Sequence, residues 1–301
     1  MGSLPVLVLG FNRPDLLGGL LETLRLQKPR KIFVAIDGPR IDVPHDIELV
    51  EQSKKCLEKI DWPSDTFTLF RDTNLGCGRA VSEAISWFFE HVDEGIILED
   101  DVRPDAAFFP YVYDLTYRYR GDPRVISISG ANTVPPHRQS QSDSYRLSRI
   151  PQVWGWATWR DRWMDYSLDI RGWQSGWRLQ DRWTAMGSSI GAYVAWTLNF
   201  NRVARRRLDT WDYQLVYLAM RSQRLTTIPR YSLVSNVGFG QSATHTRRVL
   251  SSPLVFGTSV LDHGPAQTFA PDTRADDWMM RHVYGFSIAA QLSKRLKVRG
   301  Q

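Results

Sequence analysis

Three consecutive carboxylates, Glu99, Asp100 and Asp101, stand at the end of a short apolar run that begins at Gly95. The run has the pattern of a buried β-strand. Because adjacent acids repel one another, they require a cation or a solvated face. One interpretation is a site for a hard divalent metal with oxygen ligands and substrate phosphates. The other is a polar loop, with Asp105 among the first-turn acids of the next helix.

The segments around this acidic triplet alternate between strand and helix patterns. We predict strands over 5–11, 31–36, 66–70, 95–99 and 125–129, with helices starting near residues 13, 46, 74 and 104. Such alternation predicts an α/β fold with a mostly parallel, doubly wound sheet. Ligands of such sheets bind beyond the carboxyl ends of the strands. Polar groups at those ends favour the metal-and-phosphate interpretation; they are Arg13, Asp37, Arg71, Asp72, the triplet and Asn132.

The composition is that of a soluble globular protein. The 301 residues are 43% hydrophobic and 23% charged, with 38 Lys and Arg against 32 Asp and Glu. The net charge of +6 favours anionic partners such as nucleotides, phosphates, acidic glycans or an anionic membrane surface. Cys56 and Cys77 fit no metal or redox spacing and resemble ordinary thiols of a reducing compartment. With no signal-peptide pattern or membrane-spanning apolar run, we expect a cytoplasmic protein.

The motifs, in this order, resemble the GT-A-fold nucleotide-sugar glycosyltransferases, including N-acetylglucosaminyltransferase I and related bacterial glycosyltransferases. The resemblance covers roughly residues 5–245 and is carried by 8–14, 35–38, 99–101, 104–111, 127–132, 153–159, 211–212 and 228–240. It implies a Rossmann-like, mostly parallel central sheet flanked by helices, with a Trp-rich acceptor-side half. It also implies three parts: a nucleotide-sugar-binding half (1–134), an acceptor-side and catalytic-base half (135–260) and a C-terminal tail with a basic helix (261–301).

On this resemblance, the donor site lies around the triplet. Asp101 would bind the Mn²⁺ or Mg²⁺ ion that bridges the donor's phosphates, while Glu99 and Asp100 orient sugar and ribose hydroxyls. Asp37 would accept a hydrogen bond from the N–H of a uracil ring, or else serve only as an Asp-Gly turn residue. Arg13 would lie near the diphosphate or base, or else be a surface arginine beside a helix start.

The resemblance also assigns residues from later in the chain. Asp212 would be the base that takes a proton from the acceptor hydroxyl, with Asp209 as the fallback; the alternative for Asp212 is a helix-dipole role. His245 would reach the metal or diphosphate, or else be an exposed loop histidine. Arg79 or Asn74, at a glycine-containing helix start, would contact the donor or act only in helix capping.

Aromatic and basic groups complete the candidate set. Trp154 and Trp156 would line the acceptor cleft, although core packing explains at least two of the group Trp154, Trp156 and Trp159. Arg205, Arg206 and Arg207 form either a solvated helix face or a contact for an anionic acceptor or membrane. The basic C-terminus, with Lys294 and Arg295, also allows peripheral contact with the inner face of a membrane.

The function implied is a metal-dependent inverting glycosyltransferase that moves a sugar from a nucleotide diphosphate sugar, UDP-linked, to a glycan, lipid-linked glycan or other hydroxyl in surface polysaccharide synthesis. One alternative is a sugar-1-phosphate nucleotidyltransferase, which would be expected to carry a glycine-rich loop with Arg after the first strand, unlike residues 10–14. The other is a non-catalytic glycan- or nucleic-acid-binding protein. Nucleic acid is disfavoured as a partner because the polar groups converge on acids, which repel phosphate unless a metal intervenes.

Overall fold

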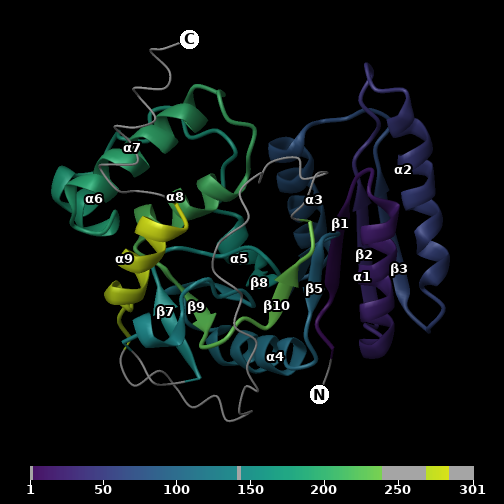
Figure 1. The fold of residues 1–301 in the computed structure, drawn as a ribbon, viewed down its shortest axis with the longest axis horizontal. Helices are drawn as coiled ribbons and strands as arrows, with labels where there is room; N and C mark the ends of the chain where they lie inside the picture. The colour runs from purple at the N-terminus through teal and green to yellow at the C-terminus, as the bar shows by residue number, and fades with distance from the viewer. Residues whose placement is uncertain (1–2, 141–143, 239–268, 285–301) are drawn as a thin grey trace.

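The computed structural model describes residues 3–140, 144–238 and 269–284, which form an α/β structure around one large sheet (Figure 1). The sheet has the strand order β3-β2-β1-β4-β8-β6-β9-β7. Its strands are β1 (Val6–Gly10), β2 (Lys31–Ile36), β3 (Asp65–Phe70), β4 (Glu94–Glu99), β6 (Val125–Ser129), β7 (Tyr145–Ser148), β8 (Trp156–Trp159) and β9 (Leu225–Pro229). All run in one direction except β8 and β7, which are antiparallel to their neighbours. The predicted mostly parallel α/β sheet is confirmed.

The register of the central strands brings the predicted strand ends together. In β1, Val8 pairs with Val34 of β2 and with Leu98 of β4, and all three side chains are fully buried. Strands covered on both faces require such continuous apolar runs. At the carboxyl edge, Asp37 N–H donates to Gly10 O (3.1 Å) and Asp100 N–H donates to Leu9 O (2.9 Å). The loops that carry Arg13, Asp37 and the acidic triplet therefore leave the sheet side by side.

Helices cover both faces of this sheet. On one face pack α1 (Pro14–Gln27), α2 (His45–Lys55) and α4 (Phe108–Tyr119). The other face is covered by α3 (Cys77–His91), α5 (Arg160–Trp163) and α8 (Asp212–Ser222). The chain also forms short 3₁₀ turns at η1 (Cys56–Lys59), which packs beside α1 and α2, and at η2 (Pro136–Arg138).

A second group of helices packs around aromatic side chains beyond the sheet. It contains α6 (Leu179–Ala185), α7 (Ile190–Ala204) and α9 (Thr273–His282), together with part of α8. Trp173, Trp177 and Trp196 are buried at its centre, so much of the Trp-rich segment forms core. The buried pair of Arg146 and Asp276, with Nη1 and Oδ1 3.2 Å apart, joins α9 to β7. No helix among residues 3–140, 144–238 and 269–284 is long and apolar enough to span a bilayer.

Two differences from the sequence predictions involve elements next to β4. The helix predicted from Pro104 begins at Phe108, because residues Val102–Pro104 form β5, which pairs with β10 (Val234–Asn236) in a separate two-stranded sheet. Strand β8 was not predicted, and it separates β4 from β6 as an antiparallel insertion. Its four residues are too short a run to show strand periodicity.

Gly95 allows the close approach of β4 to its neighbours. A methyl group at this position would lie 2.2 Å from Cζ of Phe88 and 2.9 Å from the carbonyl oxygen of Pro5. Overpacking of this kind costs roughly 1–3 kcal/mol. We therefore expect Gly95→Ala to lower the free energy of unfolding by about that amount in urea titrations. Gly121→Ala is the matched control, since no atom lies within 4 Å of its added methyl group; equal effects of both changes would contradict this packing.

Candidate functional site

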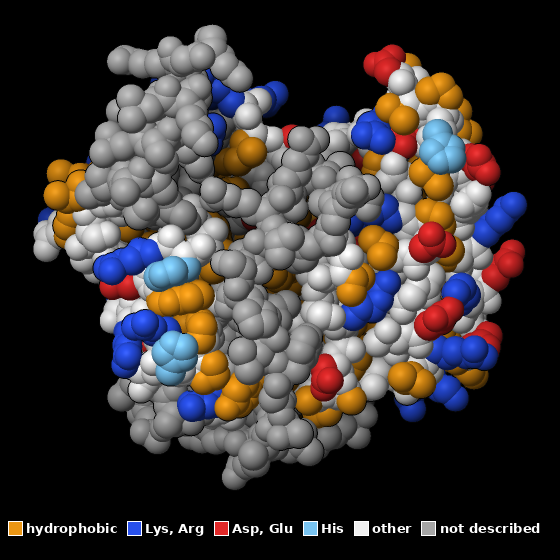
Figure 2. All heavy atoms as spheres, viewed as in Figure 1, with side chains coloured by type: hydrophobic (Ala, Val, Ile, Leu, Met, Phe, Trp, Pro, Cys, Tyr) orange, Lys and Arg blue, Asp and Glu red, His pale blue; other side chains and the backbone are white. Residues whose placement is uncertain are grey.

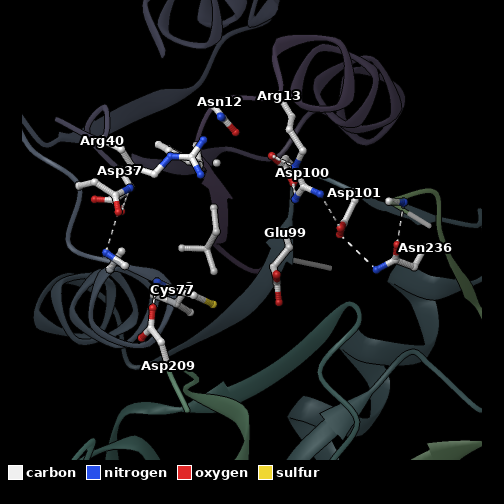
Figure 3. A pocket seen from close by; sticks show the side chains of 18 of the residues that line it. Asn12, Arg13, Asp37, Arg40, Cys77, Glu99, Asp100, Asp101, Asp209 and Asn236 are labelled. Atoms are coloured by element: carbon white, nitrogen blue, oxygen red, sulfur yellow. Dashed lines mark hydrogen bonds and ion pairs between the residues drawn. The ribbon is translucent and has the colours of Figure 1, made fainter. Parts of the chain in front are cut away.

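A pocket of about 420 Å³ opens at the carboxyl ends of β1, β2 and β4 (Figure 3). Its lining comes from segments that are far apart in sequence: the β1–α1 loop, the loops after β2 and before α3, the end of β4, and the chain after β10. Among the predicted site residues, Arg13, Asp37, Glu99, Asp100, Asp101 and Trp154 line it. Asn74 and Asp209, named as alternatives, also line it.

Arg13 forms ion pairs with two of the three acids at one end of the pocket. Its Nε donates to Oδ2 of Asp100 (3.1 Å), Nη2 donates to Oδ1 of the same carboxylate, and Nη1 donates to Oδ2 of Asp101 (3.1 Å). Burial lowers the pKa of Arg13, but the charges of Asp100 and Asp101 outweigh it and raise that pKa above its ordinary value. Since the Arg13 side chain is 25% exposed and that of Asp100 only 3%, the guanidinium covers Asp100 while facing the pocket.

Asp101 is also held from the opposite side, by residues that sequence reasoning missed. Asn236 Nδ2 donates to Oδ1 of Asp101 (3.2 Å), and Val237 N–H donates to its carbonyl oxygen (2.8 Å). Gly238 N–H donates in turn to Oδ1 of Asn236 (2.8 Å), and a Cβ on Gly238 would lie 2.3 Å from Oδ2 of Asp101. The antiparallel pairing of β10 with β5 brings Asn236 to Asp101; we call this contact the brace. Local sequence patterns could not predict it, because the two residues are 135 positions apart.

Glu99 is the third acid and lies partly buried in the pocket. Burial, followed by the charges of Asp101 and Asp100, raises the pKa of Glu99 to about 8. Asp212 adds a smaller effect in the same direction. Glu99 therefore carries a proton at neutral pH unless a cation binds beside it.

Asp37 organises the other end of the pocket. Its carboxylate accepts hydrogen bonds from the N–H groups of Gly38 (3.0 Å) and Leu75 (3.1 Å) and from Asn74 Nδ2 (2.8 Å). Burial raises the pKa of Asp37 against the effect of these donors. Asp37 thus ties the loop after β2 to the loop before α3, while the predicted hydrogen bond to a base remains a prediction.

Arg40 and Phe11 widen this end of the pocket into a partly aromatic surface. The Arg40 guanidinium lies 5.5 Å from the centre of the Phe11 ring and is anchored by Oδ2 of Asp46, at 2.6 Å from Nε. Asn12 Nδ2 donates to Oδ1 of the same carboxylate (2.7 Å). The hydrogen bond from Arg40, more than any other effect, lowers the pKa of Asp46 to about 2. A planar cation beside a ring is suited to stacking against a nucleobase.

Asp209 closes the pocket from the second half of the chain. Its carboxylate accepts hydrogen bonds from the N–H groups of Cys77 (2.9 Å) and Gly78 (2.8 Å) at the start of α3. A Cβ on Gly76 would lie 2.6 Å from Oδ2 of Asp209, so this approach requires glycine. The helix start that was predicted to contact phosphate therefore holds a carboxylate of the chain itself.

Asp212, the predicted catalytic base, is not among the described residues that line this pocket. It begins α8 and accepts a hydrogen bond from Oγ1 of Thr210. Arg79 also lies outside the lining; its side chain is 62% exposed and pairs with Glu83, at 2.6 Å from Nε to Oε1. His245 and the basic residues 294–299 lie outside the described residues.

The three tryptophans near residue 155 divide between site and core. Trp154 is partly exposed and lines the pocket. Trp156 is 1% exposed and stacks on Trp211 with ring centres 5.7 Å apart, and Trp159 is 2% exposed. The prediction that Trp156 contacts an acceptor is wrong, because its ring is enclosed in the core.

The pocket supplies oxygen ligands that suit Mg²⁺ or Mn²⁺ together with phosphates. The described residues contain no cluster of three or more His, Cys, Asp or Glu side chains arranged for a metal ion. Mg²⁺, however, commonly uses only one or two carboxylates and takes its other ligands from phosphate and water. Asp101 and Glu99 both line the pocket and are the carboxylates that would hold such an ion.

Comparison with known proteins identifies no family. No protein-family model and no curated protein matches the chain. Among solved structures, HddC from Yersinia pseudotuberculosis matches with 14% identity over 55% of this chain and 80% of that chain, at a TM-score of 0.33. The same protein complexed with GMP-PN gives 11% identity, coverages of 53% and 78%, and a TM-score of 0.32. The inositol-1-phosphate CTP transferase from T. maritima matches with 9% identity over 55% of this chain and 74% of that chain, at a TM-score of 0.30.

The glycosyltransferase prediction is corrected by this comparison. Of these matched structures, the one whose name states an activity is a CTP transferase, and another is complexed with GMP-PN. None of the three names states a glycosyltransferase activity. With identities of 9–14% and TM-scores of 0.30–0.33, the matches are too weak to assign an activity, so the pocket must supply the support for one.

The raised pKa of Glu99 makes stability depend on pH. Since its pKa rises from the ordinary 4.5 to about 8 on folding, the folded state holds a proton that the unfolded state releases. The stability present below pH 4.5 is therefore lost as the pH rises through 8. Glu99→Gln should remove this loss, so its advantage over the unsubstituted protein grows across that range to a few kcal/mol at most.

Urea unfolding at the two ends of this pH range, in chelator, measures that difference. Glu58→Gln, at an exposed position, is the matched control and should leave the pH dependence unchanged. An identical pH dependence in Glu99→Gln and the unsubstituted protein would contradict the assignment of this proton to Glu99.

Proposed function

We propose that the chain is a metal-dependent nucleotidyltransferase that joins a nucleoside monophosphate unit from a nucleoside triphosphate to a sugar 1-phosphate. The observation that supports this most is the polarity of one pocket. Arg13 and the acidic triplet stand at one end, and Asp37, Asn74 and Arg40 stand at the other. A nucleotide bound along the pocket would have its base toward Arg40 and its phosphates toward Arg13, and Asp101 would hold the metal ion.

The reaction requires the approach of two anionic substrates. A phosphate oxygen of the sugar 1-phosphate attacks the α-phosphorus of the triphosphate, and the bond from that phosphorus to the bridging oxygen breaks, releasing pyrophosphate. Asp101 and Glu99 would hold a divalent metal, which would neutralise charge at the phosphates. Arg13 supplies a planar cation on the same side, because its Nη1 lies against Asp101 and its side chain is partly exposed.

A phosphate nucleophile needs no general base. The second pKa of a phosphate monoester is about 6, so the attacking oxygen is already deprotonated at neutral pH. This agrees with the state of the two carboxylates predicted as bases. Asp209 is engaged by two backbone N–H groups, and Asp212 accepts from Thr210 and is not among the described residues lining the pocket. A hydroxyl nucleophile would require one of them to be available.

The β1–α1 loop departs from the glycine-rich loop expected of a nucleotidyltransferase. Between Gly10 and Pro14 it carries Phe11, Asn12 and Arg13. In our proposal Arg13 performs the phosphate-binding role of such a loop with its side chain. Its side chain would exchange part of its contact with Asp101 for a phosphate oxygen when metal binds, since both cations compete for Oδ2 of that carboxylate.

We expect the purified chain to release pyrophosphate when a nucleoside triphosphate, a sugar 1-phosphate and Mg²⁺ are supplied together. A panel of the four triphosphates with several sugar 1-phosphates, read by a coupled pyrophosphate assay and by chromatography of the nucleotide sugar, measures this. Asp101→Asn and Arg13→Gln should each lower kcat/KM by roughly a hundredfold or more, the scale for losing one charge-stabilising group.

Arg79→Gln is the matched control for Arg13→Gln, because Arg79 is exposed and outside the pocket lining. It should retain full activity. Absence of pyrophosphate release with every pair of substrates, or equal activity of Arg13→Gln and Arg79→Gln, would contradict the proposal.

A further inference from the structure

An apolar stripe faces outward on α7. Ile190, Val194 and Leu198 follow one another at intervals of four residues and are 68%, 38% and 42% exposed. Such spacing places side chains on one face of a helix. The opposite face packs into the helical core through Ala195, Trp196, Phe200 and other buried residues. Helix α7 is therefore apolar on two faces along its first two turns, only one of which is needed for packing.

Helix α6 extends this stripe. Leu179 and Trp183, four residues apart, are 62% and 37% exposed. The Trp183 ring lies 5.9 Å from that of Tyr193 on α7, so the two helices adjoin at this point. Hydrophobic side chains are visible at the edge of the molecule where α6 lies (Figures 1 and 2). We call the five side chains Leu179, Trp183, Ile190, Val194 and Leu198 the α6–α7 apolar surface.

Arginines flank this surface almost without acids. Residues 178–207 contain six arginines and one acid, Asp181, giving a charge of +5. Arg178, Arg202, Arg205 and Arg207 are exposed, and none forms an ion pair with another residue in the described parts of the chain. Arg202 on α7 and Arg205, the residue that caps its C-terminus, continue the outward face one turn or more beyond Leu198.

We propose that the α6–α7 apolar surface binds the surface of an anionic phospholipid bilayer. Exposed aliphatic side chains and a tryptophan enter the interface, while the flanking arginines contact anionic headgroups. The positive charge of residues 178–207 favours an anionic bilayer over a neutral apolar partner. Peripheral binding needs no spanning helix, and none is present among the described residues.

This contact would bring the pocket close to the membrane. The chain leaves α7 at Ala204 and reaches Asp209, which closes the pocket at the start of α3, within five residues. Arg206, between them, has a positive φ of 54°, a conformation that only small or Asn-like residues adopt readily. The connection is therefore short and sharply turned. The proposal does not depend on the reaction assigned to the pocket.

Cosedimentation of the full chain with lipid vesicles tests this proposal. We expect binding to vesicles of equal parts phosphatidylcholine and phosphatidylglycerol, and little binding to phosphatidylcholine alone or in high salt. Replacing Arg202, Arg205 and Arg207 together by Gln should weaken binding on the order of a hundredfold, at about 1 kcal/mol for each arginine. Replacing Ile190, Val194 and Leu198 together by Ser should weaken it at least tenfold.

The matched control replaces Leu26, Ile41 and Ile47 by Ser, because these are 82%, 89% and 59% exposed in the first half of the chain. It should bind vesicles as the unsubstituted protein does. Unfolding curves of each variant check that it folds. We expect them to match that of the unsubstituted protein, since none of the replaced side chains is buried. Failure of the unsubstituted chain to bind anionic vesicles would overturn the proposal. So would undiminished binding by the Ser or Gln variants, or a dimer in solution that the α7 Ser variant dissociates.

Discussion

The ion pair of Arg13 with Asp100 and Asp101 is the interaction on which this end of the sheet depends. Three consecutive acids leave β4 at a point where Asp100 is almost fully buried, and such charges are costly without a partner. The β1–α1 loop provides it because β1 and β4 are paired in parallel, with Leu9 opposite Glu99. The brace from Asn236 then fixes the remaining oxygen of Asp101. The pocket is thus organised around a cluster of charges that one arginine only partly balances.

Two further long-range contacts complete the pocket, and both use carboxylates as acceptors for loop N–H groups. Asp37 joins the loops after β2 and before α3, and Asp209 joins α3 to the chain that follows α7. Each carboxylate accepts hydrogen bonds from backbone N–H groups that would otherwise need water or a ligand as acceptor. These contacts explain why acids predicted to serve substrate are partly committed to structure. Glu99, Asp101 and Arg13 are the residues lining the pocket to which the proposed function assigns phosphate and metal.

Much of the fold could be predicted because strand and helix periodicities are local properties. The alternation up to residue 129 gave the parallel sheet and placed Arg13, Asp37 and the triplet at one edge, where the structure has them. The insertion of β8 could not be predicted, since its four residues show no strand periodicity and its partners in β6 lie 27 or more residues away. The same is true of Asn236 and Gly238, whose role depends on the pairing of β10 with β5. The density of tryptophans near Trp156 suggested a sugar-binding surface. Its ring is buried in the core instead, and burial depends on tertiary packing that local sequence does not show.

In the proposed reaction, phosphates and a divalent metal meet at Asp101. Calorimetric titration with a non-hydrolysable nucleoside triphosphate analogue, with and without Mg²⁺, measures it most directly. We expect binding that requires Mg²⁺, that is accompanied by proton release as Glu99 loses its proton, and that disappears in Asp101→Asn. Binding of equal affinity without metal, or in Asp101→Asn with metal, would contradict it.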